Sequence, residues 1–544
     1  FFKLYWKTVV LLGVPILFSP IIIQNDTSVF RCLYLISIMS IYWITEVIPV
    51  HITGMIPMAM FPLFGIMNSE AVCTAYMKST IVMFIGGIVL ALSVEYCNLH
   101  KRIALTAMKL VGCNLRRLHF GVLFTTGFIS MWIPNTAAAA MMIPIVSGFL
   151  EELQSQGICQ MYEEDKSGEK KSQPTNLTKS FYIATAYASS IGGVATLIGT
   201  GTNLTFKGIY ESRFPHDSQS VNFTNWIFFA FPPALLALFF TWIYLQIVFM
   251  DLLWKSKSST QKYNLSKEGQ RVIEKVINEK LRELGPMSMH EIQIALVFVL
   301  AILLFCTRSG GDDFVGWGDT IKGISIQDSV AVIIIILLLF VIPAEWSWLN
   351  FFNKSKPLPD KASQPLITWS YINKKFPWAL IFLLGGGFAV AEGAKQSGAS
   401  LWMGEQLGGL KSLPPLAILL LVFTFSELFT NFTSNVATAN IILPVVIEMA
   451  LALEVHPLYF AIPITIAVSF AFLLPVGTPP NAIAAGFVNL KAKDFMIAGI
   501  GPTIICIIIF VFAFPTWGIV VFPKAFEEFD LDLFKHSNTI SNHS

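Results

Sequence analysis

The stretch MWIPNTAAAAMMIPI, residues 131–145, decides how this chain folds. It places a proline, an asparagine and a threonine inside a strongly apolar segment. A proline in the interior of a membrane helix removes a backbone hydrogen bond, so these residues would weaken an ordinary helix. Because the residue before a proline is pushed out of helical geometry, we expect an extended chain at Ile133 and a new helix along Ala137–Met142. The stretch therefore predicts a membrane helix that is broken at Pro134 and Asn135, in residues 134–136.

The composition is that of an integral membrane protein. Of the 544 residues, 54% are hydrophobic and 13% are charged, far from the balance of a soluble domain. Many apolar runs approach or exceed the roughly 18 to 20 residues that cross a bilayer, and we expect about eleven membrane helices. Examples of such runs are residues 8–23, 30–50, 225–250, 327–343 and 495–522. The predicted fold class is an all-α polytopic membrane protein.

Two basic segments predict which loops are cytoplasmic. Residues 97–118 carry five Lys or Arg, and residues 253–284 carry eight Lys or Arg against four Glu. Cytoplasmic loops of membrane proteins have this excess of positive charge. The second segment also has apolar residues at helical spacing, which predicts an amphipathic helix on the inner membrane surface. A nucleic-acid partner does not fit a chain of this composition.

Glycosylation sequons indicate where the termini lie. Asn25-Asp26-Thr27 follows the first apolar run, and Asn542-His543-Ser544 closes the chain. If both face outward, the protein is a glycoprotein with a cytoplasmic N-terminus and an extracellular C-terminus, which requires an odd number of crossings. The seven cysteines show no CxxC spacing, so they are interpreted as packing residues.

The broken segment is repeated 300 residues later. Aligning residues 131–145 with NFTSNVATANIILPV, residues 431–445, puts Asn135 on Asn435, and the same offset lays Gly86-Gly87 onto Gly386-Gly387. A third pair follows in the same order, GTGTN at 199–203 and GTPPN at 477–481. Two matches at one offset, and a third in the same order at an offset of 278, indicate an internal duplication.

The duplication predicts the domain organisation. If each half crosses the membrane an odd number of times, the two copies are inverted, and their broken helices meet near the bilayer midplane, as in secondary transporters. We expect a first inverted repeat at 1–252, a cytoplasmic loop at 253–286, a second repeat at 287–524 with its break at 434–436, and an extracellular tail at 525–544.

The breaks are candidate binding sites for an anion. Asn135 and Thr136 lie at a predicted helix N-terminus, where free N–H groups and the helix dipole favour negative charge. By itself a Pro-Asn break is more often a packing kink, but its repetition favours a function. Four converging helix ends could bind carboxylates without a buried arginine. The candidate residues are Asn135, Thr136, Gly201, Thr202, Asn203, Ser434, Asn435, Thr438, Thr478 and Asn481.

Other functional classes find less support. Glu95, Glu392 and Glu427 lie in or near apolar stretches, but a carboxylate beside an anion site would oppose binding, so structural roles are favoured. His290-Glu291 resembles the start of a zinc-protease HExxH motif, which fails because residue 294 is Ile. An intramembrane enzyme and an anion channel remain the alternative classes. No cofactor is predicted.

These motifs resemble those of the divalent anion:sodium symporter family, the solute carrier 13 group, over essentially the whole chain. Pro134-Asn135-Thr136 and Ser434-Asn435-Val436 correspond to its two Ser-Asn-Thr motifs, and VEYCNLHKR and FLLGGGFAVAEGAKQSG look closest to the insect Indy-type branch, which is associated with citrate. The resemblance implies a homodimer that works by an elevator motion in the plasma membrane. It also implies re-entrant hairpins near 77–95 and 376–395, with substrate carboxylates on the Asn and Thr of the motifs.

The chain departs from this family where sodium would bind. Pro134 replaces a serine and Val436 replaces a threonine, so two oxygen ligands for a hard cation are missing. The expected sodium sites are therefore degenerate; they would lie near Asn135, Gly199, Thr430, Asn435 and Gly477. We expect a sodium-independent carrier of citrate, succinate or similar dicarboxylates, working by exchange or with protons. The alternative is a sodium-coupled symporter of di- or tricarboxylates or sulfate.

Overall fold

The computed structural model describes residues 2–112, 114–163, 173–252, 267–308, 316–320, 326–347, 351 and 361–527. Within these ranges the chain is helical, and its β contacts are two isolated bridges, Tyr162–Pro174 and Pro343–Pro365. The all-α fold class is confirmed for this part of the chain. The sequon at 542–544, most of the predicted tail and the first part of the second basic segment lie outside the described residues.

The first half contains eleven α-helices labelled α1 to α11, a 3₁₀ turn and the long helix α12. Their bounds are α1 (Phe2–Gln24), α2 (Ser28–Thr45), α3 (Val50–Thr53), α4 (Ile56–Leu63), α5 (Ser69–Ala75), α6 (Ser79–Tyr96), α7 (Leu99–Val111), α8 (Leu115–Ser130), α9 (Asn135–Ser155), α10 (Asn176–Gly193), α11 (Gly201–Arg213), η1 (Pro215–Ser220) and α12 (Phe223–Met250).

The second half repeats this pattern of long and short helices. Its elements are α14 (Lys267–Glu283), α15 (Met289–Cys306), η2 (Trp317–Asp319), α16 (Asp328–Val341), α17 (Trp369–Lys375), α18 (Ala379–Ser397), α19 (Ala399–Leu407), η4 (Gly408–Ser412), α20 (Pro415–Phe429), α21 (Asn435–Ala452), α22 (Leu458–Ala467), α23 (Pro479–Val488), α24 (Ala492–Ala513), η5 (Phe514–Gly518), α25 (Ile519–Val521) and η6 (Pro523–Phe526).

Length and composition identify the membrane-spanning elements. Among the described residues, 8 helices are long and apolar enough to cross a membrane, or 9 if the pair α17–α18, bent by 64°, counts as one span. Shorter apolar helices lie at Val50–Leu63, Asp328–Val341, Pro415–Phe429 and Leu458–Ala467. The protein is therefore a multi-pass membrane protein, whereas the total of about eleven spans stays a prediction.

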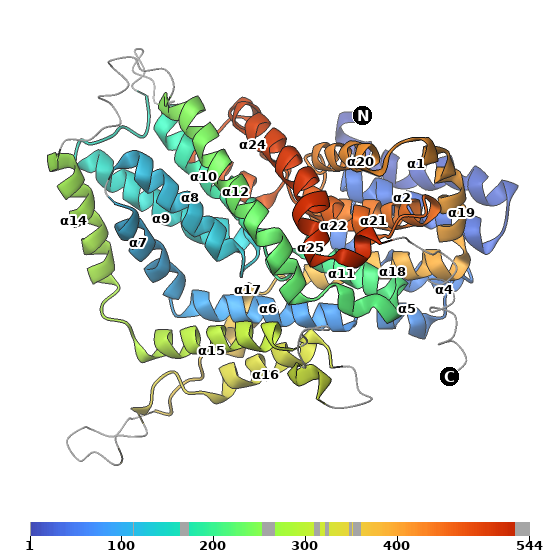
Figure 1. Cartoon of the computed structure of the whole chain (residues 1–544), viewed down its shortest axis with the longest axis horizontal. Helices are drawn as coiled ribbons and strands as arrows, with labels where there is room; N and C mark the ends of the chain where they lie inside the picture. Colours follow the sequence, from blue (N-terminus) through green and yellow to red (C-terminus); the bar gives the residue numbers. More distant parts are fainter. Residues whose placement is uncertain are drawn as a thin grey trace.

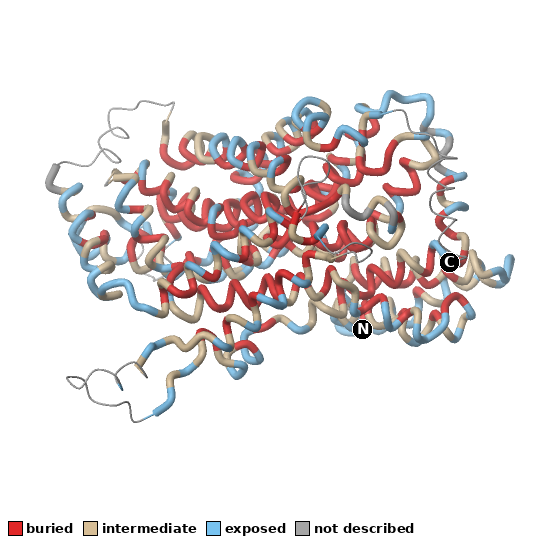
Figure 2. Tube along the Cα trace, turned by 60° about the horizontal axis from the view of Figure 1, so that its bottom comes forward, coloured by how far each residue is buried: buried red, intermediate tan, exposed pale blue. Residues whose placement is uncertain are grey.

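The outer surface of the helix bundle is apolar, as a lipid-facing surface must be. Buried segments lie mainly inside the bundle and exposed ones at its outside and ends (Figure 2). On α24, one stripe of isoleucines is about half exposed, while the opposite side of the helix is buried. The exposed stripe consists of Ile497, Ile500, Ile504 and Ile508. Because these four side chains recur at helical spacing on the outside, this face of α24 fits contact with lipid rather than water.

Two groups of helices occupy opposite ends of the long axis of the molecule (Figure 1). The helices α8, α9, α10 and α12 gather at one end, and α18 to α22 gather at the other. The helix α12 packs on α24, and α11 contacts both α18 and α21, so the two halves of the chain are in contact at the centre.

The predicted amphipathic helix exists, but its apolar face packs on protein. Ile273, Val276 and Ile277 of α14 are buried, and the helix contacts α7 and α9. We expected this face to lie on the membrane surface. The periodicity was sufficient to predict the helix, but the surface that covers an apolar face depends on tertiary packing that no local pattern contains.

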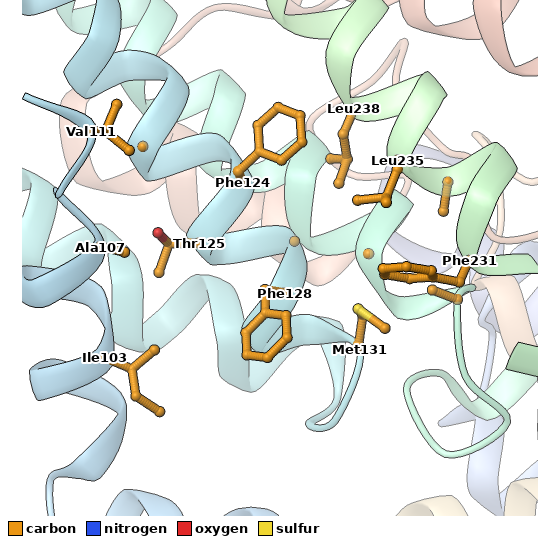
Figure 3. A pocket seen from close by; sticks show the side chains of 15 residues that line it. Ile103, Ala107, Val111, Phe124, Thr125, Phe128, Met131, Phe231, Leu235 and Leu238 are labelled. Carbon is orange, nitrogen blue, oxygen red and sulfur yellow. The ribbon is translucent and has the colours of Figure 1, made fainter.

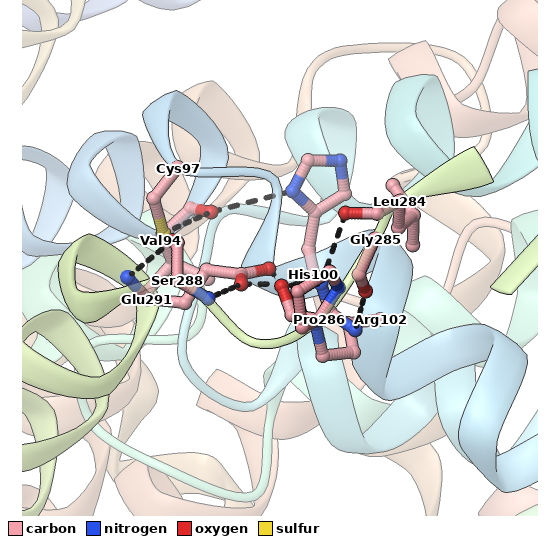
Figure 4. A network of polar contacts seen from close by, with 9 residues as sticks. All are labelled: Val94, Cys97, His100, Arg102, Leu284, Gly285, Pro286, Ser288 and Glu291. Atoms are coloured by element: carbon pink, nitrogen blue, oxygen red, sulfur yellow. Dashed lines mark hydrogen bonds and ion pairs between the residues drawn. The ribbon is translucent and has the colours of Figure 1, made fainter. Parts of the chain in front are cut away.

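A partly buried ion pair joins α7 to the junction of α14 and α15 (Figure 4). The Arg102 guanidinium donates to both carboxylate oxygens of Glu291, at 2.9 and 3.1 Å, and to the carbonyl oxygen of Gly285 at 3.0 Å. Glu291 also accepts the backbone N–H of Ser288 at 2.7 Å, which completes a capping box at the start of α15. One guanidinium therefore ends α14 and anchors α7.

Replacing Arg102 should destabilise the protein because Glu291 would stay buried without a cation. We expect Arg102→Met to remove about 3–5 kcal/mol, seen as a lower apparent melting temperature of the purified protein. The double variant Arg102→Met/Glu291→Gln should recover much of the loss, since Gln keeps the capping box. The exposed pair Lys411–Glu454, with side chains 52% and 62% accessible, is the control. An equal loss in Lys411→Met would contradict this account.

Candidate functional site

Both predicted breaks are present. The helix α9 begins at Asn135 and α21 begins at Asn435, each after a short non-helical turn, so α9 starts slightly before the expected run. The preceding residues, Pro134 and Ser434, are extended, with ψ near 140° in each. The Ser434 hydroxyl caps its helix by accepting the N–H of Ala437 at 3.2 Å, which Pro134 cannot do.

Each break is a reversal of the chain rather than a kink. The helices α8 and α9 contact each other and lie side by side (Figure 1). For α20 and α21, Lys411 precedes the first helix and Glu454 follows the second, and their side chains form an ion pair of 2.8 Å. The outer ends of the two helices therefore meet, and the motifs lie at the closed ends of two hairpins.

These positions differ from the hairpins near 77–95 and 376–395 that the family resemblance implied. Residues 77–95 form most of the single helix α6, and residues 376–395 form most of α18 together with the 64° bend that joins it to α17, with no reversal inside either helix. The glycines serve close packing instead: a Cβ on Gly386 would come within 2.4 Å of the carbonyl oxygen of Gly54. Glycine in a membrane segment is compatible with a chain reversal and with close helix packing, and the position of the neighbouring helix decides which one occurs.

A polar network closes the turn of the first hairpin. The Ser130 hydroxyl donates to the carbonyl oxygen of Ser189 at 2.6 Å and lies 3.1 Å from the Asn135 amide. When the nitrogen of the Asn135 amide points toward Ser130, it also donates to the carbonyl oxygens of Ser189 (3.1 Å) and Gly199 (3.3 Å). Asn135 thus ties the start of α9 to α10 and to the loop that follows α10.

The second hairpin repeats this network. The Thr430 hydroxyl donates to the carbonyl oxygen of Val468 at 2.8 Å and lies 3.0 Å from the amide oxygen of Asn435. The amide nitrogen of Asn435 donates to the carbonyl oxygen of Ser469 at 3.3 Å. In both halves a hydroxyl five residues before the motif asparagine, and the asparagine amide itself, bind carbonyl oxygens of a following segment, which agrees with an internal duplication.

Ser130 is a site residue that reasoning from the sequence missed. It lies at the offset of 300 residues from Thr430, which was a candidate for the second half. Applying the repeat in both directions would have found it, because the two hydroxyls occupy the same place in their networks.

Asn203 and Asn481 also have matching roles. The Asn203 amide nitrogen donates to the carbonyl oxygen of Thr196 at 2.7 Å, and that of Asn481 donates to the carbonyl oxygens of Ala471 (2.7 Å) and Leu474 (3.0 Å). Each nitrogen thereby stabilises the non-helical loop before its own helix. Within the described residues, both amide oxygens are buried and have no hydrogen-bond partner, so they remain available to a ligand.

The two halves meet through these motifs. The hydroxyls of Thr202 and Ser469 are 2.5 Å apart. A Cβ on Gly201 would come within 2.9 Å of a methyl group of Val436, so the start of α11 packs directly on the start of α21. The third motif of the first half therefore lies against the second motif of the other half.

Backbone oxygens converge beside Gly199. A Cβ there would come within 2.4 Å of the carbonyl oxygen of Gly193, 2.8 Å of that of Met131 and 3.0 Å of that of Ser130. Oxygen atoms of this kind suit a hard cation such as sodium. Oxygen donors are therefore present beside Gly199 even though Pro134 lacks a hydroxyl.

In the equivalent place of the second half, fewer of the three nearest atoms are oxygens. A Cβ on Gly477 would meet the carbonyl oxygen of Asn431 at 3.0 Å, and its other near neighbours are carbon atoms. The Thr438 hydroxyl is buried and has no partner in the described part of the chain. The described residues contain no group of three His, Cys, Asp or Glu side chains, so a transition-metal site does not arise there.

A cavity of about 1,020 Å³ lies beside the first hairpin. It is lined by α6, α7, α9, α17 and the start of α18, and it reaches Pro134 and Thr136. The exposed side chain of Lys101 lines it, as do Lys375 and Glu95, which form an ion pair of 3.0 Å. The wall therefore has more positive than negative charge, which favours an anion.

The predicted site residues differ in accessibility. Thr136 lines the cavity and is exposed to it. Gly201, Ser434 and Asn435 are half-buried. The remaining candidates are buried: Asn135, Thr202, Asn203, Thr438, Thr478 and Asn481. The structure thus gathers the candidates along the contact between the hairpins and the loops after α10 and α22, not in one open pocket.

A second cavity, of about 280 Å³, has a different character (Figure 3). It lies between α7, α8 and α12, and side chains such as Phe128, Phe231 and Leu235 line it. Its lining is almost entirely apolar, so it does not suit a carboxylate. It reaches Met131 behind the first turn and is separate from the candidate site.

The three membrane carboxylates have different environments. Glu95 pairs with Lys375, and Glu392 accepts a hydrogen bond of 3.0 Å from Gln396 on the same helix. Both contacts fit structural roles. Glu427 is fully buried, and its carboxylate has no hydrogen-bond partner among the described residues, so no contact there explains it as a structural group.

Comparisons with known proteins identify the family. Residues 1–523 match the family described as sodium:sulfate symporter transmembrane region. The Drosophila melanogaster protein named "Protein I'm not dead yet" is 47% identical, over 96% of this chain and 90% of its own. The mouse Na(+)/citrate cotransporter is 35% identical (94% and 95%), and mouse Na(+)/dicarboxylate cotransporter 3 is 36% identical (95% and 92%).

The fold agrees with that of a solved transporter. The YdaH transporter of Alcanivorax borkumensis has a TM-score of 0.52 with this chain at 14% identity, covering 82% of this chain and 86% of its own. The alternative of an intramembrane enzyme is set aside, because the similar proteins are transporters. The chain belongs to the sodium:sulfate symporter family, the solute carrier 13 group of membrane transporters.

Proposed function

We propose that this chain is a plasma-membrane carrier that moves citrate and related dicarboxylates such as succinate, without sodium, by exchange or together with protons. The observation that carries the proposal is the pair of matching networks at Asn135 and Asn435. One of them lies beside a cavity with Lys101 on its wall. The names of the similar mouse proteins, a citrate and a dicarboxylate cotransporter, support this substrate class.

The substrate carboxylates would bind at helix N-termini and at side-chain hydroxyl and amide N–H groups, while the free amide oxygens of Asn203 and Asn481 could accept only from a hydroxyl or hold a cation. Asn135, Thr136, Ser434, Asn435 and Thr438 would supply polar groups of the two hairpins. Gly201, Thr202, Asn203, Thr478 and Asn481 would complete the site from α11 and α23. The absence of any described carboxylate among these residues supports an anionic ligand, since a negative charge would oppose it.

The membrane potential argues for a coupled process. Moving each charge across 100 mV involves about 2.3 kcal/mol, so a dianion entering a negative interior faces roughly 4.6 kcal/mol, on the order of a thousandfold. Uniport would therefore favour efflux. Net uptake requires protons, another cation, or exchange for an internal anion.

A sodium-coupled symporter is the second candidate, favoured by the carbonyl oxygens around Gly199. These oxygens could hold one sodium ion without any hydroxyl from residue 134. The second half supports this less, because Val436 has no hydroxyl and Gly477 faces one carbonyl oxygen. Sodium would be a transported ion here, not a resident cofactor.

We also infer the arrangement in the membrane. The inverted repeats would be 1–252 and 287–524, joined by the cytoplasmic loop 253–286. The packing of α7 against α14 brings the described parts of both basic segments together, which supports a shared cytoplasmic location for them; with the sequons, it favours an N-terminus inside and a C-terminus outside. A homodimer with an elevator motion would follow the family.

Removing either motif amide should stop transport. We expect Asn135→Ala and Asn435→Ala each to lower citrate uptake by about tenfold or more, because buried carbonyl oxygens lose their donor and the substrate loses a ligand. Uptake by cells with surface-labelled, folded protein is the measurement. Asn278→Ala on α14 is the control. Wild-type uptake in either motif variant would refute the site.

Coupling can be tested in proteoliposomes. We expect citrate uptake that is equal in sodium and in choline and that rises when the vesicles contain succinate, because an exchanger couples the two fluxes. A channel would show no such counterflow. Strong sodium dependence into empty vesicles would instead support the second candidate.

Restoring the missing hydroxyls should create sodium dependence. Pro134→Ser/Val436→Thr supplies two oxygen ligands, and Thr has nearly the shape of Val beside Gly201. We expect citrate uptake by this double variant to be stimulated by sodium. Val436→Ala, which adds no hydroxyl, is the control. Sodium stimulation of the wild-type protein to the same extent would contradict the importance of these two positions.

A further inference from the structure

A chain of four buried charges runs between helices at the centre of the protein. Lys207 pairs with Glu211 at 3.0 Å and with Asp328 at 3.5 Å, and Asp328 pairs in turn with Arg308. All four side chains are at most 14% exposed. The two positive and two negative charges balance each other.

These four charged residues connect a candidate binding motif to helices that are distant in the sequence. Lys207 and Glu211 lie on α11, whose first residues are the motif Gly201–Asn203. Asp328 is the first residue of α16, and Arg308 follows α15. From α6, the Thr80 hydroxyl also donates to Glu211 at 2.8 Å.

The way in which the four charges are paired affects the energy of separating the helices. Removing one partner of a buried ion pair leaves an uncompensated charge and is strongly unfavourable. Here, however, each side of the contact is neutral by itself: Lys207 with Glu211 on α11, and Arg308 with Asp328 on the other side. The helix α11 can therefore move away from α16 without leaving any charge unpaired. One ionic contact, Lys207–Asp328, joins the two sides.

We propose that Lys207 is a positioning residue of the transport cycle, whose contact with Asp328 holds α11 against α16 while the 1,020 Å³ cavity is open and releases α11 when the cavity closes. This inference rests on the proposed function, because it assigns the contact to one state of the carrier. The contact acts on the substrate site through the motif at the start of α11.

Accessibility of the cavity provides the test. In Ala140→Cys, the new thiol lies on the cavity wall, and its rate of reaction with a polar maleimide is followed by mass spectrometry of that peptide, without substrate. Two neutral double variants remove the contact from either side: Lys207→Met/Glu211→Gln and Arg308→Met/Asp328→Asn. We expect each to slow the reaction by about fivefold or more, as the population with an open cavity falls.

A matched pair elsewhere separates this role from general stability. Lys179 and Asp494 form an ion pair of 2.9 Å between α10 and α24, with side chains about as buried as that of Glu211. Lys179→Met/Asp494→Asn should leave the rate unchanged. If the folded fraction of either test variant reacts at the rate of Ala140→Cys alone, or if the control slows it equally, the proposal is overturned.

The proposed function can fail independently. If the wild-type protein shows no citrate counterflow, the substrate class is wrong, but the labelling rates still decide the role of the Lys207–Asp328 contact, because they are measured without substrate. The test needs only one of the two double variants to fold, because each removes a different partner of the Lys207–Asp328 contact.

Discussion

The structure depends on satisfying backbone groups where membrane helices are interrupted. No water in the bilayer core can bond to a free N–H or C=O, so a broken helix is stable only if the protein supplies partners. Here side-chain amides do so: Asn203 and Asn481 hold the loops before their helices, and Asn135 and Asn435 tie the hairpin turns to neighbouring carbonyl oxygens. The same four residues are also the ones proposed to bind substrate, so substitutions at them would be expected to affect stability and binding together.

The repeated networks explain how one site can be assembled from two halves. Each half alone offers a hairpin end and a loop after a buried helix, but the start of α11 packs on the start of α21 rather than on its own hairpin. The candidate site is therefore shared. Lys101 and the cavity belong to one side only, so the environment of the two motifs differs although their hydrogen bonds match.

Much of this arrangement could be predicted from local signals. The positions of Pro134 and Asn435 and the periodicity of α14 predicted two helix starts and one amphipathic helix. What could not be predicted depended on partners distant in sequence: Gly386 of α18 packs on Gly54 inside a continuous helix, and α14 is covered by α7. Ser130 was missed for another reason, since a lone serine in an apolar helix has no local signature, although the repeat pointed to it.

The contact between Gly201 and Val436 constrains how this protein can evolve. After a duplication, two copies of a motif usually drift apart, each tolerating its own substitutions. Here a larger residue at 201 would require a smaller one at 436, although the two positions descend from different motifs. Substitutions in the two halves must therefore be matched at positions that are not equivalent in the repeat. A hybrid that takes one half from a distant relative would pack poorly where residues 201 and 436 meet.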